Sequence, residues 1–192
     1  MALTASTMLA LGTKAPDFQL TEVTTGEQIS LHGFCDKKAL LVMFLCQHCP
    51  YVKHIQDHLA LLGKDYFGSG LGIVAISSND AAKYPDDSPE SLGLMSRGLQ
   101  FKFPLLYDES QRVAQAFTAA CTPDFFLFDS NRQLVYRGQL DDSRPGNSRP
   151  ITGSDLRNAI DAILLGKPVS ADQKPSIGCN IKWKPGQQPS YS

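Results

Sequence analysis

The stretch Cys46-Gln47-His48-Cys49-Pro50 directly follows a run of purely apolar residues at 39–45, ALLVMFL. A short run without polar residues is typical of a strand that is buried on both faces. Proline suits the first turn of a helix, because the N–H group that it lacks would have no partner there. Beyond Pro50, apolar residues recur on one helical face, at Val52, Ile55, Leu59 and Leu62. The sequence therefore predicts a central strand that passes into an amphipathic helix, with both cysteines at the junction.

Outward from this junction, the apolar periodicity predicts an alternation of strands and helices. Expected strands cover residues 71–76 and 103–107, and expected hairpins pair residues 18–20 with 28–31 and 125–128 with 134–137. Expected helices cover residues 50–63, 88–98, 109–117 and 154–165. This order predicts an α/β fold, in which a central mixed β-sheet has helices on both faces and an N-terminal β-hairpin.

Two helix ends carry more specific expectations. Gly63 is predicted to end the first helix, because glycine is common just past a helix C-terminus. Asp108 is predicted to cap the helix at 109–117. Gln111 is then placed to return the second hydrogen bond of a capping box.

Length and composition limit the classes of function. A chain of 192 residues, 42% of them hydrophobic, is expected to form one domain over residues 1–192, with the Pro- and Gly-rich residues 167–192 as a tail packed on it. A net charge of -1 provides no basic surface for nucleic acid. No apolar run approaches the roughly 18 residues of a membrane span, and the first basic residue, Lys14, comes too late for a secretory signal. We therefore expect a cytoplasmic protein, and the oligomeric state stays open.

The chain has five cysteines, an odd number that argues against a structural disulfide framework in the cytoplasm. Cys46 and Cys49 form a C-x-x-C pair at a strand-to-helix junction, which is the context of a redox motif. The helix N-terminus and a protonated His48 favour a thiolate. This favours Cys46 as an acidic nucleophile and Cys49 as the thiol that resolves the mixed disulfide. A structural zinc site normally needs four ligands, usually from two such pairs, so no metal site and no cofactor are predicted.

Several motifs together resemble the thioredoxin-like superfamily, and in particular its redoxin branch. The opening Gly12-Thr13-Lys14-Ala15-Pro16-Asp17-Phe18 is similar to the start of redoxins. Thr122-Pro123 looks like the cis-proline position of the superfamily, which packs against the cysteine pair and helps to bind the incoming thiol. The separation between Cys49 and Pro123 is longer than in small thioredoxins, and the added length falls before residue 103, where redoxins carry an insertion.

A narrower resemblance joins the two ends of the chain. Phe44-x-Cys46-x-His48-Cys49-Pro50-Tyr51-Val52 and Gly178-Cys179-x-Ile181-Lys182-Trp183 look like a bacterial group of peroxiredoxin-like, thioredoxin-family proteins. The resemblance implies a thioredoxin-like fold with a redoxin-type insertion and a thiol–disulfide oxidoreductase with antioxidant activity. Its partners would be protein or small-molecule thiols and disulfides. Thr122 and Pro123 would dock the thiol.

The sequence differs at two points from the peroxiredoxins and thioredoxins that it resembles. Peroxiredoxins carry Pro-x-x-x-Thr-x-x-Cys with the reactive cysteine at the position of Cys49, but here the Thr and Pro positions are Cys46 and Val42. We therefore expect slow reaction with peroxide. Thioredoxins carry a buried acid shortly before the first cysteine, and residues 39–45 contain none.

Two alternatives to the oxidoreductase stay open. One is a thiol peroxidase that uses Cys49 or Cys46. The other is a metal-binding or redox-sensing protein that holds copper or iron through Cys46, Cys49 and a histidine.

Cys179 lies in the tail, close to Ile177, Ile181 and the single tryptophan, Trp183. Disordered segments are poor in such large apolar residues, so we expect this stretch to dock on the body with Trp183 as its anchor. Cys179 is then either a third redox thiol, which attacks the Cys46–Cys49 disulfide, or a packed small residue at a sheet edge.

Overall fold

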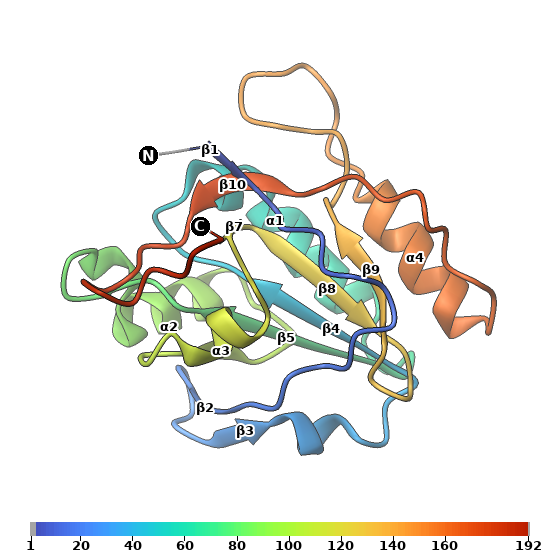
Figure 1. Ribbon diagram of the computed structural model, residues 1–192, viewed down its shortest axis with the longest axis horizontal. Helices are drawn as coiled ribbons and strands as arrows, with labels where there is room; N and C mark the ends of the chain where they lie inside the picture. Colours follow the sequence, from blue (N-terminus) through green and yellow to red (C-terminus); the bar gives the residue numbers. More distant parts are fainter. Residues whose placement is uncertain (1–2, 192) are drawn as a thin grey trace.

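A computed structural model describes residues 3–191, which fold around a seven-stranded mixed sheet (Figure 1). The strand order is β3-β2-β6-β5-β4-β8-β9. These strands are β2 (Gln19–Glu22), β3 (Gln28–Ser30), β4 (Ala39–Phe44), β5 (Leu71–Ser77), β6 (Leu105–Tyr107), β8 (Asp124–Phe128) and β9 (Leu134–Gly138). β5 is parallel to β4 and to β6, and every other pair of neighbours is antiparallel. The expected mixed sheet and its N-terminal hairpin, β2–β3, are confirmed.

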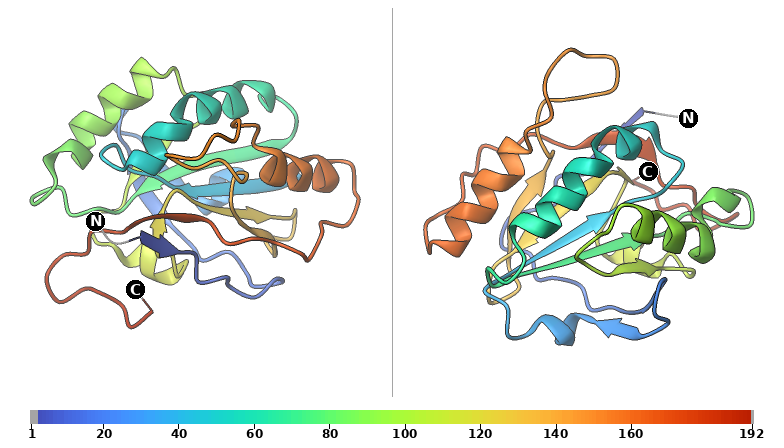
Figure 2. Two further views of the ribbon diagram at one scale, coloured as in Figure 1. Left: turned by 90° about the horizontal axis from the view of Figure 1, so that it is seen from above. Right: turned by 180° about the vertical axis from the view of Figure 1, so that it is seen from behind.

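β4 lies inside the sheet and is completely buried, as its apolar sequence predicts. Alternate residues face two cores, because successive side chains of a strand point to opposite faces. Leu41 and Met43 belong to a core that also contains buried residues of α1 (Pro50–Asp65), α2 (Pro89–Gly98) and α4 (Ser154–Leu164). Leu40, Val42 and Phe44 belong to the other core, with residues of α3 (Arg112–Ala116). Helices therefore cover both faces, as Figure 2 shows. Two short 3-10 turns, η1 (Leu31–Phe34) and η2 (Pro85–Asp87), complete the helical elements of residues 3–191.

The prediction that Gly63 ends the first helix is wrong, since α1 continues to Asp65. A Cβ atom at Gly63 would lie 2.7 Å from Cδ1 of Phe103. The glycine therefore lets the ring of Phe103 pack directly on the helix backbone. Its role is close packing inside the helix and not termination.

The capping box predicted at Asp108 and Gln111 is only half right: Oδ2 of Asp108 accepts from the N–H group of Ala114 in the first turn of α3 at 3.0 Å, but the side chain of Gln111 binds elsewhere. α3 begins at Arg112, and Gln111 is its N-cap residue, with a left-handed φ of 62°. The side-chain amide of Gln111 donates to the carbonyl oxygens of Ser78 and Lys182, at 2.6 and 2.9 Å. Gln111 thus holds the C-terminal segment of the chain, a partner that local sequence does not reveal.

A second, three-stranded sheet has the order β1-β10-β7 and was not predicted. Its strands are β1 (Leu3–Ala5), β10 (Ile177–Asn180) and β7 (Cys121–Thr122). Figure 1 shows β10, from the end of the chain, lying between β1 and β7. Beyond β10, Trp183 is half-buried and packs against the core that contains α3.

None of the helices within residues 3–191 combines the length and the apolar character that crossing a membrane would require.

Candidate active site

The two cysteines of the C-x-x-C pair lie where β4 passes into α1. The helix begins at Pro50, so Cys49 is its N-cap residue and Cys46 lies in the loop before it. Both residues are fully buried and both are thiols. The junction predicted from the sequence is therefore present, but only Cys49 lies at the helix N-terminus.

Thr122 of β7 contacts both thiols. Its Oγ1 atom lies 3.1 Å from Sγ of Cys46, and its carbonyl oxygen accepts a hydrogen bond from Sγ of Cys49 at 3.2 Å. The peptide bond between Thr122 and Pro123 is cis. The structure thus brings Thr122 and Pro123, 70 or more positions along the chain, to the cysteine pair, as the resemblance implies.

A third thiol joins the pair from the C-terminal strand. Cys179 of β10 stands opposite Thr122 in the antiparallel register of β10 and β7. Its side chain shares a hydrogen bond with that of Cys49. Cys179 is 4% exposed, so all three sulfur atoms are withdrawn from solvent.

The charge of this cluster centres on Cys49. A hydrogen bond from Cys46 lowers the pKa of Cys49 to about 5, against the effect of burial and with further help from Cys179 and the Val52 N–H group. Burial raises the pKa of Cys46 well above its usual range, and the hydrogen bond to Cys49 and the negative charge of Asp87 act in the same direction. An acidic Cys46 was expected, but these hydrogen bonds favour the thiolate at Cys49, which is also the N-cap residue of α1.

Asp87, in η2, organises the loop between the cysteines and was not identified from the sequence. Oδ1 accepts hydrogen bonds from the backbone N–H groups of Gln47 and His48, at 2.7 and 3.2 Å. Oδ2 lies 2.5 Å from Nδ1 of His48 and accepts from Nδ2 of Asn79 at 2.8 Å. Burial raises the pKa of Asp87, but the hydrogen bonds from His48 and Asn79 outweigh it and lower the pKa overall. The charged carboxylate therefore fixes the loop.

His48 is held between Asp87 and an aromatic ring. Its imidazole stacks on Tyr84 with ring centroids 5.3 Å apart, and its Nε2 atom is buried without a hydrogen-bond partner within the described residues. Cys46, His48 and Asp87 each place a possible metal ligand within 4.8 Å of the others. A soft thiolate and an imidazole suit copper or zinc. Coordination through Nδ1 of His48 would, however, break its short contact with Asp87.

Replacement of Asp87 is expected to loosen this loop. Asp87→Ala leaves its buried donors without an acceptor, which should lower the free energy of unfolding by roughly 3 kcal/mol. Asp87→Asn keeps one acceptor and should lose less. Because the folded-state pKa of Asp87 lies below its unfolded value of 3.8, its contribution is present above that pH and lost as the pH falls through the folded-state value.

Urea unfolding of the reduced proteins measures this effect, with the exposed neighbour Asp86 as the matched control. Equal stability of Asp87→Ala and Asp86→Ala would show that the carboxylate does not hold the loop.

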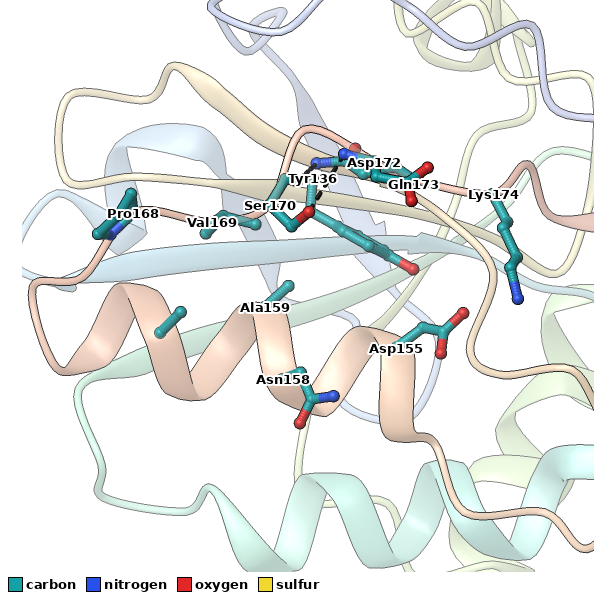
Figure 3. A pocket seen from close by; sticks show the side chains of 11 residues that line it. Tyr136, Asp155, Asn158, Ala159, Pro168, Val169, Ser170, Asp172, Gln173 and Lys174 are labelled. Atoms are coloured by element: carbon teal, nitrogen blue, oxygen red, sulfur yellow. Dashed lines mark hydrogen bonds between the residues drawn. The ribbon is translucent and has the colours of Figure 1, made fainter.

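Several cavities lie away from the thiols. One, of ≈ 410 Å³, lies between α4 and residues 168–174, with Tyr136 of β9 between them (Figure 3). None of its lining residues belongs to the thiol site. A much smaller pocket, of ≈ 20 Å³, adjoins Pro123 and is lined in part by Tyr51, Ser176 and Ile177. Little free space is thus left beside Pro123.

Comparisons with known proteins agree with this geometry. The family model described as Redoxin matches residues 10–160. The chain is 26% identical to the thiol-disulfide oxidoreductase ResA of Geobacillus kaustophilus (strain HTA426) over 133 residues, which cover 68% of this chain and 70% of that protein.

Two solved structures are similar over most of the chain. One is an uncharacterized conserved protein from Geobacillus kaustophilus, with a TM-score of 0.94, 52% identity and coverage of 96% of this chain and 98% of that chain. The other is the thioredoxin domain of a thiol-disulfide oxidoreductase from Bacteroides vulgatus, with a TM-score of 0.63, 19% identity and coverage of 81% and 99%. The second likeness confirms the expected thioredoxin-like fold.

Proposed function

Because the chain belongs to the redoxin family, we propose that it is a thiol–disulfide oxidoreductase that cycles Cys46 and Cys49 between two thiols and one disulfide. An oxidoreductase activity follows from the family and from the ResA relative. The use of this particular pair is the proposal. It rests on one observation, the gathering of two buried thiols around Thr122 at the N-terminus of α1.

The reaction balances with these residues alone. The Cys49 thiolate attacks a substrate disulfide, forms a mixed disulfide and releases one substrate thiolate. Cys46 then attacks Cys49 Sγ, which forms the Cys46–Cys49 disulfide and releases the second substrate thiolate. Two electrons pass from the pair to the substrate, and the reverse sequence oxidises a dithiol.

This order of attack reverses the one expected from the sequence, in which Cys46 attacks first. The charge at Cys49 supports the reversal, because the thiolate is the nucleophile in disulfide exchange. Burial keeps the pKa of Cys46 high, together with the hydrogen bond to Cys49 and the negative charge of Asp87. Cys46 thus retains its proton while Cys49 is charged and becomes the attacking group once Cys49 is bound to substrate.

Exchange with oxidised glutathione and with a disulfide-containing peptide tests the proposal. Cys46→Ser and Cys49→Ser should each lower turnover by at least roughly 100-fold, since each removes one of the two covalent steps. Cys46→Ser/Cys179→Ser, which leaves neither neighbouring thiol to resolve it, should accumulate a mixed disulfide on Cys49. Cys121→Ser, which alters a buried thiol outside the proposed pair, is the control.

Two outcomes would contradict the assignment. Turnover that survives both substitutions would remove the pair from the mechanism. A mixed disulfide that accumulates on Cys46 in Cys49→Ser, but not on Cys49 in Cys46→Ser/Cys179→Ser, would restore the order expected from the sequence.

Thiol peroxidase activity is the second candidate, favoured by the position of Cys49 as N-cap residue of α1. The Thr and Pro that orient peroxide in peroxiredoxins are Cys46 and Val42 here, so stopped-flow oxidation by hydrogen peroxide should be as slow as that of an ordinary thiolate. A rate several orders of magnitude higher, with sulfenic acid at Cys49, would make peroxide the substrate.

A further inference from the structure

The C-terminal strand β10 lies against the strand that carries the proposed docking residues. β10 pairs antiparallel with β7, with Cys179 opposite Thr122 and Asn180 opposite Cys121. An extended peptide that adds to a sheet edge pairs in this manner through its main chain. The chain's own C-terminal segment thus occupies the edge of β7 beside Cys46 and Cys49.

The close approach of the two strands depends on a glycine. A Cβ atom at Gly178 would lie 2.0 Å from the carbonyl oxygen of Thr122, well inside any permitted contact. The same carbonyl oxygen lies 3.2 Å from Sγ of Cys49. Gly178 therefore lets the backbone of β10 come close enough for the next residue, Cys179, to reach the thiol pair.

Hydrogen bonds on both sides of Cys179 hold β10 in place. Before it, the hydroxyl of Ser176 donates to the carbonyl of Pro123 at 2.6 Å. After it, the N–H group of Lys182 donates to Oδ1 of Asn79 at 2.8 Å, and Asn79 also binds Asp87. The position of Cys179 is thus fixed by the same network that fixes the loop between Cys46 and Cys49.

We propose that Cys179 is a third redox thiol that exchanges with Cys49, so that β10 acts as a built-in substrate strand. The proposal rests on the function proposed above and extends it. The side chain of Cys179 shares a hydrogen bond with that of Cys49, which makes Cys49 its partner. Thr122 contacts both sulfur atoms of the pair and lies opposite Cys179. This one residue therefore lies at the centre of the three cysteines.

The exchange step transfers no net electrons. In the oxidised protein, the sulfur of Cys179 attacks Sγ of Cys49, the Cys49–Cys179 bond forms and the Cys46–Cys49 bond breaks. Cys46 leaves as a thiolate and takes up the proton that Cys179 gives up. The disulfide thereby moves from the pair to β10, and attack by Cys46 on Cys49 returns it. A reductant or a substrate thiol can then act on the disulfide at β10.

Disulfide mapping of the full-length protein tests this step. The variant is Cys46→Ser in a Cys35→Ser background, which removes the exposed thiol, and the oxidant is oxidised glutathione. We expect the glutathione adduct on Cys49 to give way to a Cys49–Cys179 disulfide. In Cys46→Ser/Cys179→Ser the adduct should persist, while Cys46→Ser/Cys121→Ser should behave as the parent. An adduct that persists in Cys46→Ser itself, with native circular dichroism, would overturn the proposal.

A second variant tests the placement of β10 without removing a sulfur. Gly178→Ala should displace β10 from Thr122 and lower the yield of Cys49–Cys179 disulfide roughly tenfold, because intramolecular exchange depends on alignment. Gly33→Ala, where a Cβ atom meets nothing within 4 Å, is the matched control. An unchanged yield in Gly178→Ala would contradict the role of β10, as would a Cys46–Cys179 disulfide as the main product in Cys49→Ser.

The wild-type protein separates this inference from the proposed function. If it forms the Cys46–Cys49 disulfide and turns over, but Cys46→Ser forms no Cys49–Cys179 bond, then only the third thiol is wrong. If the wild-type pair does not oxidise at all, the proposed function itself is wrong.

Discussion

Cys49 in the reduced protein should ionise with a midpoint near pH 5, far below the pKa of about 8.5 of an ordinary cysteine. The cause is geometric, since the thiols of Cys46 and Cys179 and two backbone N–H groups all point at one sulfur. Ionisation gives up a single contact, the hydrogen bond from Cys49 to the carbonyl of Thr122. The ultraviolet absorbance of the thiolate, followed against pH, measures the midpoint directly.

Single substitutions identify the sulfur that carries the charge. Cys49→Ser should lose the transition near pH 5. Cys46→Ala and Cys179→Ala should each retain a transition of Cys49, but with its midpoint at a higher pH, because each substitution removes one hydrogen-bond donor to the thiolate. Cys35→Ser should leave the transition unchanged, because this thiol lies outside the cluster. Loss of the low transition in Cys46→Ala, with retention in Cys49→Ser, would show that Cys46 is the acidic thiol.

The same ionisation makes stability depend on pH. The folded-state pKa of Cys49 lies below its unfolded value, so its contribution is fully present above the unfolded pKa and is lost as the pH falls towards 5. Cys46 and Cys179 act in the opposite sense at alkaline pH, because their raised folded-state pKa values favour the protonated thiols. The reduced wild type should therefore lose more stability than Cys49→Ala between pH 8 and pH 5.

The junction that holds the cysteine pair could be predicted because its determinants are local. The purely apolar run 39–45 is typical of a strand that is buried on both faces, and Pro50 fixes the start of the next helix. The runs 125–128 and 134–137, on either side of turn residues, likewise predicted the hairpin β8–β9, and the apolar residues at helical spacing predicted α4. Pro123 and Thr122 were placed beside the pair by resemblance, and not by any local pattern.

Residues that act over long sequence separations could not be predicted in this way. Asp87 lies in the polar loop after β5, and nothing in the neighbouring sequence specifies that its carboxylate will accept hydrogen bonds from two N–H groups of the loop after β4. The pairing of β10 with β7 could not be predicted either, because β7 has only two residues and neither strand shows a periodicity. The signal that was available for Asp87 is its position in the loop after β5, where open α/β sheets place their sites.

Arg137 of β9 is a further residue to which the sequence assigned no role. Its side chain is fully buried and lies over the ring of Phe126, 4.3 Å from the centroid. Nη2 pairs with the equally buried Asp124 at 3.2 Å and donates to the carbonyl of Thr118 at 2.8 Å. Asp124 in turn accepts a hydrogen bond from the hydroxyl of Ser6 at 2.7 Å. This group joins Ser6, which directly follows β1, and Arg137 of β9 to the residue that follows Pro123.

Arg137→Met should be among the most destabilising single substitutions in the chain. Methionine fills much of the same space, but it leaves the buried carboxylate of Asp124 without its cationic partner, a loss of about 3–5 kcal/mol. Urea unfolding measures the effect, and Arg149→Met is the control, because the ion pair of Arg149 with Asp142 is exposed and worth little.

The double variant Arg137→Met/Asp124→Asn distinguishes an unpaired charge from lost packing. If the unpaired carboxylate causes the loss, removing its charge should restore part of the stability, so that the double variant is more stable than Arg137→Met alone. If the loss arises from the packing of Arg137 on Phe126, the two substitutions should instead add. Because Asp124 directly follows Pro123, the stability recovered by the double variant would also measure how firmly this pair anchors the strand end beside the thiols.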